Sequence, residues 1–312
     1  MKKIQLVIIL ALLTVMAVKA QNTNREKLDA YRELDINRLS IGMQTAVDQE
    51  LILLNRIHRF EDVKKTVKTA KEAGFQNISL DLMFGLPGQT IIKWQYSLEQ
   101  AVKLQPNHIS LYSLTIEENT PLFFKYERGE LPLIDPDLVA DMYAFAIEYL
   151  PSEGYTQYEI SNWHRGDIEN QCRHNLQYWK NLPYLGFGAG AHSYWNNCRF
   201  ANMRGIAEYI NCVARIEETK SKDSCREEFH ENTNYQDMQD TMMLGLRLVE
   251  QGVSRNEFLK RYGCEPESVF SDEIKRCVSK GLLMLDVEND RYKLTQRGVF
   301  LGNLVFLEFV GD

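Results

Sequence analysis

Residues 78–90 read Ile-Ser-Leu-Asp-Leu-Met-Phe-Gly-Leu-Pro-Gly-Gln-Thr, and this stretch decides the fold class. Apolar and polar side chains alternate from 78 to 84, which predicts a β-strand, and two glycines and a proline then end it. Thr90 can cap a following helix, whose apolar residues recur at helical spacing until Pro106. Asp81 stands midway along the apolar strand, where burying a carboxylate is costly unless a structural partner or a ligand binds it. Asp81 is therefore the first candidate site residue.

Two similar strand patterns flank this stretch. Residues 36–44 are followed by a helical pattern through Ala73, and residues 109–116 follow the helix that ends near Leu104. Alternating strands and helices predict a parallel sheet with right-handed crossovers, either doubly wound or closed as a barrel. Both architectures collect ligands at the carboxyl ends of the strands. Gln44, Asp81 and Thr115 lie at or near those ends, which makes them a candidate group.

Composition and charge indicate an ordinary globular protein. The chain has 312 residues, of which 44% are hydrophobic and 25% charged, so it is long enough for two modest domains. Its formal net charge of -7 comes without a basic block, which argues against nucleic acid as a partner. The six cysteines are at least 13 residues apart, at positions 172, 198, 212, 225, 264 and 277. No zinc motif follows from this spacing, and free buried thiols are expected.

Residues 1–20 differ from the rest of the chain. Two lysines precede an apolar run from Ile4 to Val18, and a polar residue follows Ala20, which is the pattern of a secretory signal. This run of fifteen residues falls short of the roughly 20 that span a bilayer, so a cleaved signal is favoured over an anchor. This predicts no packing role for the segment, and leaves export or membrane association as an alternative to a cytoplasmic location.

The second half contains three further features. Cys-Arg-His-Asn-Leu-Gln-Tyr-Trp (172–179) is followed by a glycine-rich stretch (185–193), and a helix at 172–179 would place His174 and Tyr178 on one face. A lone histidine is more often structural than a ligand. The polar residues 219–234 predict a linker. Residues 235–312 predict three helices and a hairpin, an order like that of a winged helix, whose third-helix charges favour protein contacts over DNA.

Four motifs in this order resemble the radical-SAM haem chaperone family, called HemW, from about Arg25 to the C-terminus. They are Asn-Arg-Leu-Ser-Ile-Gly-Met-Gln (37–44), Asn-Arg-Ile-His (55–58), Asp-Leu-Met-Phe-Gly-Leu-Pro-Gly-Gln-Thr (81–90) and residues 172–179. The family is closely similar to the oxygen-independent coproporphyrinogen III oxidases of porphyrin biosynthesis. The resemblance implies a partial radical-SAM barrel with the haem motif (25–218), a linker (219–234) and a winged-helix-like domain (235–312).

The resemblance also implies two sets of ligand contacts. Gln44, Arg56, Asp81 and Thr115, with His192 as a weaker match, occupy positions that line the S-adenosylmethionine pocket in the family. A carboxylate such as Asp81 can accept from ribose hydroxyls or the ammonium group, and Arg56 can pair with the methionyl carboxylate.

The stretch 172–179 resembles the haem-associated motif of the family, which makes His174 the leading ligand for haem iron. Cys172 is the alternative ligand, and Tyr178, Trp179 and Phe187 are expected to give apolar cover.

The chain departs from the family in one respect. The C-x3-C-x2-C motif, whose thiolates hold a 4Fe-4S cluster, is missing, and the signal-like segment stands in its place. Without clustered thiolates no iron can bind S-adenosylmethionine, so the chain is expected to be inactive alone as a radical enzyme. Three barrel strands would also leave strand 36–44 with an unpaired edge. This indicates a truncated form or a start upstream of Met1.

Three functions compete at this point. The first is a haem-binding chaperone that delivers haem to acceptor proteins in the cytoplasm. The second is a coproporphyrinogen oxidase-like enzyme as part of a longer parent, and the third is an exported scaffold that binds other proteins. Cleavage after Ala20 would favour the third.

Overall fold

The computed structural model describes residues 15–18, 23–132, 135–219 and 225–310, and its contacts divide the chain into two compact units. The first unit ends at Gln171 and the second begins at Cys172. The boundary therefore lies inside the segment 25–218 that the resemblance implies as one domain.

The first unit is built on a six-stranded mixed sheet. In spatial order its strands are β1 (Val15–Val18), β2 (Arg38–Gln44), β3 (Asn77–Phe84), β4 (His108–Ser113), β6 (Asn162–Arg165) and β5 (Tyr155–Glu159). The first four are parallel, as the alternation of strands and helices predicts. The strand β6 was not predicted. Only two residues join it to β5, and so short a connection makes an antiparallel hairpin. The strand β6 also runs antiparallel to β4, its neighbour on the other side.

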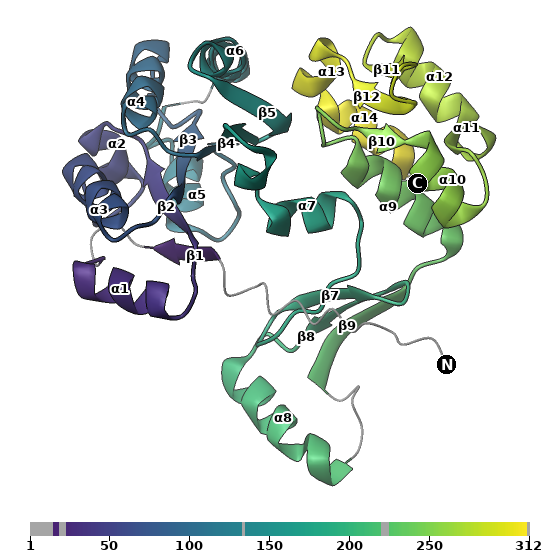
Figure 1. Ribbon diagram of the computed structural model, residues 1–312, viewed down its shortest axis with the longest axis horizontal. Coiled ribbons are helices and arrows are strands. Elements are labelled where there is room, and N and C mark those ends of the chain that lie inside the picture. The colour runs from purple at the N-terminus through teal and green to yellow at the C-terminus, as the bar shows by residue number, and fades with distance from the viewer. Residues whose placement is uncertain (1–14, 19–22, 133–134, 220–224, 311–312) are drawn as a thin grey trace. The chain divides into compact units, whose positions relative to one another are not determined.

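The helices of this unit follow the predicted strand-helix order. Their bounds are α1 (Arg25–Glu33), α2 (Asp48–Leu53), α3 (Phe60–Glu72), α4 (Ile91–Lys103), α5 (Pro121–Glu127) and α6 (Pro136–Ser152), with a short 3₁₀ turn η3 (Ile168–Asn170). Thr90 caps α4 through a hydrogen bond from Lys93 N to its hydroxyl (3.3 Å), as the sequence predicts. Figure 1 shows α3, α4 and α6 beside the strands.

One face of the sheet carries the hydrophobic core. The buried side chains of alternate strand positions, such as Ile41, Leu80, Leu82 and Ile109, pack with α3, α4 and α6. Burying them contributes roughly 1.5–3 kcal/mol each. The opposite face is left to the polar side chains at the intervening positions, and it forms the candidate site.

The edge of the sheet corrects the prediction for residues 1–20. Val15–Val18 pairs in parallel with β2 from Arg38 to Ile41, so strand 36–44 does not have an unpaired edge. The expectation that the segment has no packing role is thus wrong for these four residues, and the rest of the segment lies outside the described residues. Within the described part of the chain, none of the helices is long and apolar enough to cross a membrane.

The second unit begins with α7 (Arg173–Trp179) and a small antiparallel sheet. Its strands are β7 (His192–Trp195), β8 (Cys198–Asn202) and β9 (Arg226–Glu231), and α8 (Ile206–Thr219) lies between β8 and β9 in sequence. The predicted linker 219–234 is therefore wrong, because a strand occupies most of its described part. Cys212 and Cys225 form a disulfide that joins α8 to the start of β9, which corrects the expectation of free thiols at these two positions.

The C-terminal part of this unit has the predicted helices and hairpin. The elements are α9 (Asn234–Gly245), β10 (Val253–Ser254), α10 (Arg255–Tyr262), α11 (Pro266–Val269), α12 (Ser271–Ser279), β11 (Leu283–Asp286), β12 (Arg291–Leu294), α13 (Gln296–Phe300) and α14 (Gly302–Val310). The hairpin β11–β12 and β10 form a three-stranded sheet. Arg276 on α12 and Lys280, the C-cap residue of that helix, both pair with Glu308.

Candidate functional site

The polar face of the large sheet brings Asp81 together with side chains of four strands. The register aligns one row as Ser40, Ser79, His108 and His164, and the next as Gly42, Asp81, Ser110 and Asn162. The Ser40 hydroxyl donates to Asp81 Oδ2 (2.6 Å). Burial raises the pKa of Asp81, and the hydrogen bonds from Ser40, Ser110 and Ser79 and the charge of Arg38 offset only part of this.

Gln44 lies close to this carboxylate. It ends β2 with a left-handed backbone (φ 65°), and its side chain folds back over Gly42, where a Cβ would come within 2.7 Å of Gln44 Nε2. A Cβ at this position would push the end of the Gln44 side chain aside. Because Gly42 pairs with Asp81 on the next strand, the amide and the carboxylate are neighbours on one face.

The other predicted S-adenosylmethionine contacts are more dispersed. Arg56 is exposed between α2 and α3, and Thr115 is exposed two residues beyond β4. His192 begins β7, so it belongs to the second unit. The structure thus brings Gln44 and Asp81 together, and Arg56 and Thr115 lie in loops that follow α2 and β4.

The buried carboxylate of Glu50, which contacts residues that follow β2 and β3, was not predicted. Glu50 on α2 accepts hydrogen bonds from Thr45 Oγ1 (2.6 Å) and Gln89 Nε2 (3.1 Å), both at its Oε2 atom. Gln89 belongs to the turn after β3, so this carboxylate links that turn to the end of β2. One partner of this carboxylate, Gln89, lies in the stretch 78–90, so the sequence contained a signal for the contact.

Two buried histidines occupy the row beside Asp81. His108 is bonded at Nδ1 to Ser79 Oγ (2.8 Å) and at Nε2 to Tyr158 OH (2.8 Å). Its pKa is well below the usual range because burial removes water from the imidazolium ion, and because Arg38 and His164 lie nearby. The folded chain therefore holds His108 neutral.

We expect this histidine to make folding pH-dependent. An unfolded histidine binds a proton below a pKa of about 6.5, whereas folded His108 does not, so stability is present above that pH and is lost as the pH falls. The free energy of unfolding should decrease between pH 7.5 and 5.5 by up to about 1.4 kcal/mol per pH unit. Urea titrations of the wild type and His108→Asn test this. An equal pH dependence in both proteins would contradict it.

The predicted haem motif forms the helix α7, whose two faces differ. His174 is exposed, its ring lies 4.9 Å from the Tyr178 ring at 90°, and its Nε2 is 3.2 Å from the Tyr178 hydroxyl. The Tyr184 ring continues this cluster at 4.6 Å from Tyr178. Loss of water around the ring lowers the pKa of His174, which keeps the imidazole neutral and able to bind a metal.

The other residues expected around the haem, Cys172, Trp179 and Phe187, have different surroundings. Cys172 precedes α7 as its N-cap residue and is half-buried. Phe187 is 71% exposed in the glycine-rich loop and can cover a ligand. The Trp179 ring, in contrast, is covered by the guanidinium of Arg247 on the C-terminal side of α9, with 4.3 Å from Arg247 Cζ to the ring centroid. Trp179 therefore packs onto the C-terminal domain.

The cysteines do not fit a 4Fe-4S cluster. Cys212 and Cys225 are joined to each other, and the four thiols outside this disulfide are at positions 172, 198, 264 and 277. Burial raises the pKa of Cys277 to about 11, which disfavours the thiolate that iron requires. No group of three His, Cys, Asp or Glu side chains suited to a metal occurs among the described residues.

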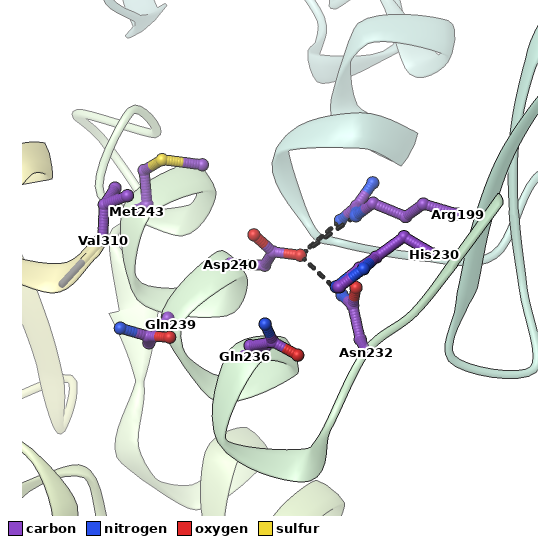
Figure 2. A pocket seen from close by; sticks show the side chains of 8 residues that line it. All are labelled: Arg199, His230, Asn232, Gln236, Gln239, Asp240, Met243 and Val310. Atoms are coloured by element: carbon purple, nitrogen blue, oxygen red, sulfur yellow. Dashed lines mark hydrogen bonds and ion pairs between the residues drawn. The ribbon is translucent and has the colours of Figure 1, made fainter. Parts of the chain in front are cut away.

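A pocket of about 290 Å³ lies between α9 and the β8–β9 strands (Figure 2). Its lining residues are Arg199, His230, Asn232, Gln236, Gln239, Asp240, Met243 and Val310. The two charged groups facing each other across it pair internally, since Arg199 donates to Asp240 Oδ2 from Nε (3.0 Å) and Nη2 (2.8 Å). The pocket thus offers mainly neutral amides and one histidine.

Comparison with known proteins agrees with the fold and the motifs. The radical SAM superfamily model matches residues 3–101, and the HemN C-terminal domain model matches residues 233–301. The first match includes the strand Val15–Val18, which pairs with β2 in the sheet. A solved structure, coproporphyrinogen III oxidase (HemN) from Escherichia coli, superposes with a TM-score of 0.74 at 20% identity, over 95% of this chain and 69% of that one.

These observations define a radical-SAM-type α/β protein with an added C-terminal domain. Among curated relatives, Heme chaperone HemW of Bacillus subtilis is 38% identical over 96% of this chain and 77% of that protein, and its Lactococcus lactis counterpart is 34% identical over 92% and 72%. A mouse relative, radical S-adenosyl methionine domain-containing protein 1, mitochondrial, is 34% identical over 83% and 59%. The chain belongs to the HemW family.

Proposed function

We propose that this protein binds haem at α7 and passes it to acceptor proteins, as a haem chaperone of the HemW type. The observation that carries the proposal is the exposed His174–Tyr178 pair within a family whose curated members are named heme chaperones. A neutral imidazole beside aromatic rings offers both an iron ligand and an apolar surface for the macrocycle. By family resemblance, haem delivery takes place in the cytoplasm.

A transfer experiment tests the delivery step. The haem-loaded chain, separated from free haem, is mixed with an apo-haem protein such as apomyoglobin, and the Soret band of the acceptor is followed. We expect transfer faster than from haem adsorbed to an unrelated protein. If the chain binds haem but does not transfer it, the protein is a haem-binding protein without a delivery function.

The polar face of the sheet supports a second part of the proposal, namely contacts to S-adenosylmethionine. Asp81 can accept hydrogen bonds from ribose hydroxyls, and Gln44 lies beside it to bind a further polar group. Arg56 and Thr115 supply a cation and a hydroxyl from the loops that follow α2 and β4. S-adenosylmethionine brings a methionyl carboxylate and a sulfonium centre when bound, and these residues would hold and orient it.

Asp81 allows a specific prediction. Its pKa is raised because burial disfavours the charge, so at neutral pH the carboxylate costs stability when no ligand is bound. Asp81→Asn should therefore melt at the same or a higher temperature, while any shift of melting temperature caused by S-adenosylmethionine should be lost. Thermal scans with and without ligand measure both effects. The exposed Asp141→Asn on α6 is the matched control, and a destabilised Asp81→Asn protein would show a structural carboxylate instead.

A further inference from the structure

Directly after α7, Asn181 joins the haem motif to three other elements of the second unit. Asn181 is 2% exposed, and its Nδ2 donates to Asp237 Oδ1 on α9 (2.9 Å). Its Oδ1 accepts from Arg199 Nη2 on β8 (2.9 Å), and its backbone carbonyl accepts from Arg261 Nη1 on α10 (2.9 Å). The donor and acceptor of its side chain are thus both satisfied by distant parts of the chain.

Asp237 is the second half of this junction. The carboxylate is 3% exposed and accepts from Arg261 Nη2 (2.8 Å), from Tyr262 OH (2.6 Å) and from the hydroxyl of Tyr194 on β7, in addition to Asn181. Burying a charge is costly unless it is paired and fully hydrogen-bonded. Here one guanidinium, two hydroxyls and one amide meet that cost, and they come from α10, β7 and the end of α7.

The junction and the Trp179–Arg247 contact fix only one end of α7. Both lie at the C-terminal end of the helix, whereas His174 lies in its first turn and is exposed. Within the described residues, Trp179 Nε1 has no hydrogen-bond partner, so the indole is held by stacking and packing alone. The direction of α7, and with it the position of His174, therefore depends on the C-terminal domain.

We propose that Asn181 and Asp237 are positioning residues for the haem site, and that the C-terminal domain serves to hold α7 in its binding orientation. The proposal rests on the proposed function. It assigns to α9 and α10 a role in haem affinity without contact to haem. Arg199 belongs both to this junction and to the lining of the pocket in Figure 2, whereas Gln239 of α9 lines the pocket and makes none of the junction's hydrogen bonds described above.

Two variants of Asn181 separate its amide from its backbone. Asn181 has a left-handed backbone (φ 47°), which glycine adopts at no cost and alanine does not. Asn181→Gly removes the side chain with its amide and adds no backbone strain, whereas Asn181→Ala removes the amide and adds strain. Both should weaken haem binding about fivefold or more, with alanine the worse, and both should raise hydrogen exchange in residues 173–180. Gln239→Ala, which lines the pocket outside the junction, is the control and should match the wild type.

The two readouts keep this proposal distinct from the proposed function. If the wild type does not bind haem, the proposed function fails, while exchange at α7 in Asn181→Gly still tests the junction. If Asn181→Gly is folded, binds haem like the wild type and shows unchanged exchange at α7, the positioning role is overturned. If Asn181→Gly does not fold, Tyr262→Phe decides by the same two readouts. It keeps the ring and removes the hydroxyl, which bonds the Asp237 carboxylate, the Asp237 backbone carbonyl and the Thr241 hydroxyl.

Discussion

Replacing His174 with alanine is expected to weaken haem binding at least about tenfold, about 1.4 kcal/mol, and to shift the Soret band. The side chain is exposed on the first turn of α7, and its lowered pKa leaves the imidazole neutral at pH 7. If Nε2 binds the iron, the Tyr178 hydroxyl gives up a 3.2 Å contact, which costs little because the hydroxyl can turn to water. Absorbance titration of haem into both proteins measures the change.

Two further variants make this result specific. Cys172→Ser should have the smaller effect, because Cys172 is half-buried as the N-cap residue of α7 whereas His174 is exposed. His230→Ala removes another exposed histidine of the same unit, on β9, and should leave the titration unchanged. Equal spectra and affinities for His174→Ala and the wild type would make His174 a structural residue.

The second large effect is expected in iron-sulfur chemistry. Reconstituted anaerobically with iron and sulfide, this chain should hold no stoichiometric 4Fe-4S cluster, because its six cysteines cannot supply three thiolates to one site. Iron analysis, absorbance and electron paramagnetic resonance measure the cluster content. Any substoichiometric iron should be loosely held at the half-buried thiols of Cys172 and Cys198, so a variant with Cys172→Ser and Cys198→Ser should lose part of it.

A different outcome of the same experiment would overturn this expectation. About one cluster per chain, with reductive cleavage of S-adenosylmethionine, would mean that cysteines distant in sequence converge. The chain would then have to be regarded as a radical enzyme in its own right.

The local patterns of the sequence predict most of the elements. The alternation around Asp81, the cap at Thr90 and the helical spacing in 172–179 each correspond to an observed element, because each depends on neighbouring residues. The winged-helix order in 235–312 is found for the same reason.

Features that depend on distant contacts were not predicted. The strand at Val15–Val18 has an apolar run that also fits a signal, and only its pairing with β2 distinguishes the two. The disulfide between Cys212 and Cys225 requires the start of β9 to lie close to α8. Asn181 and Asp237 are 56 residues apart, so no local period reports their hydrogen bond. Tertiary packing decides all three.

The most direct test of the account is a haem titration of the complete wild-type chain, followed by resonance Raman spectroscopy. We expect saturable binding of one haem per chain, with the signature of a nitrogen ligand that disappears in His174→Ala. Binding without saturation, or a ligand signature that is the same in the wild type and in His174→Ala, would contradict the assignment of the haem site to α7.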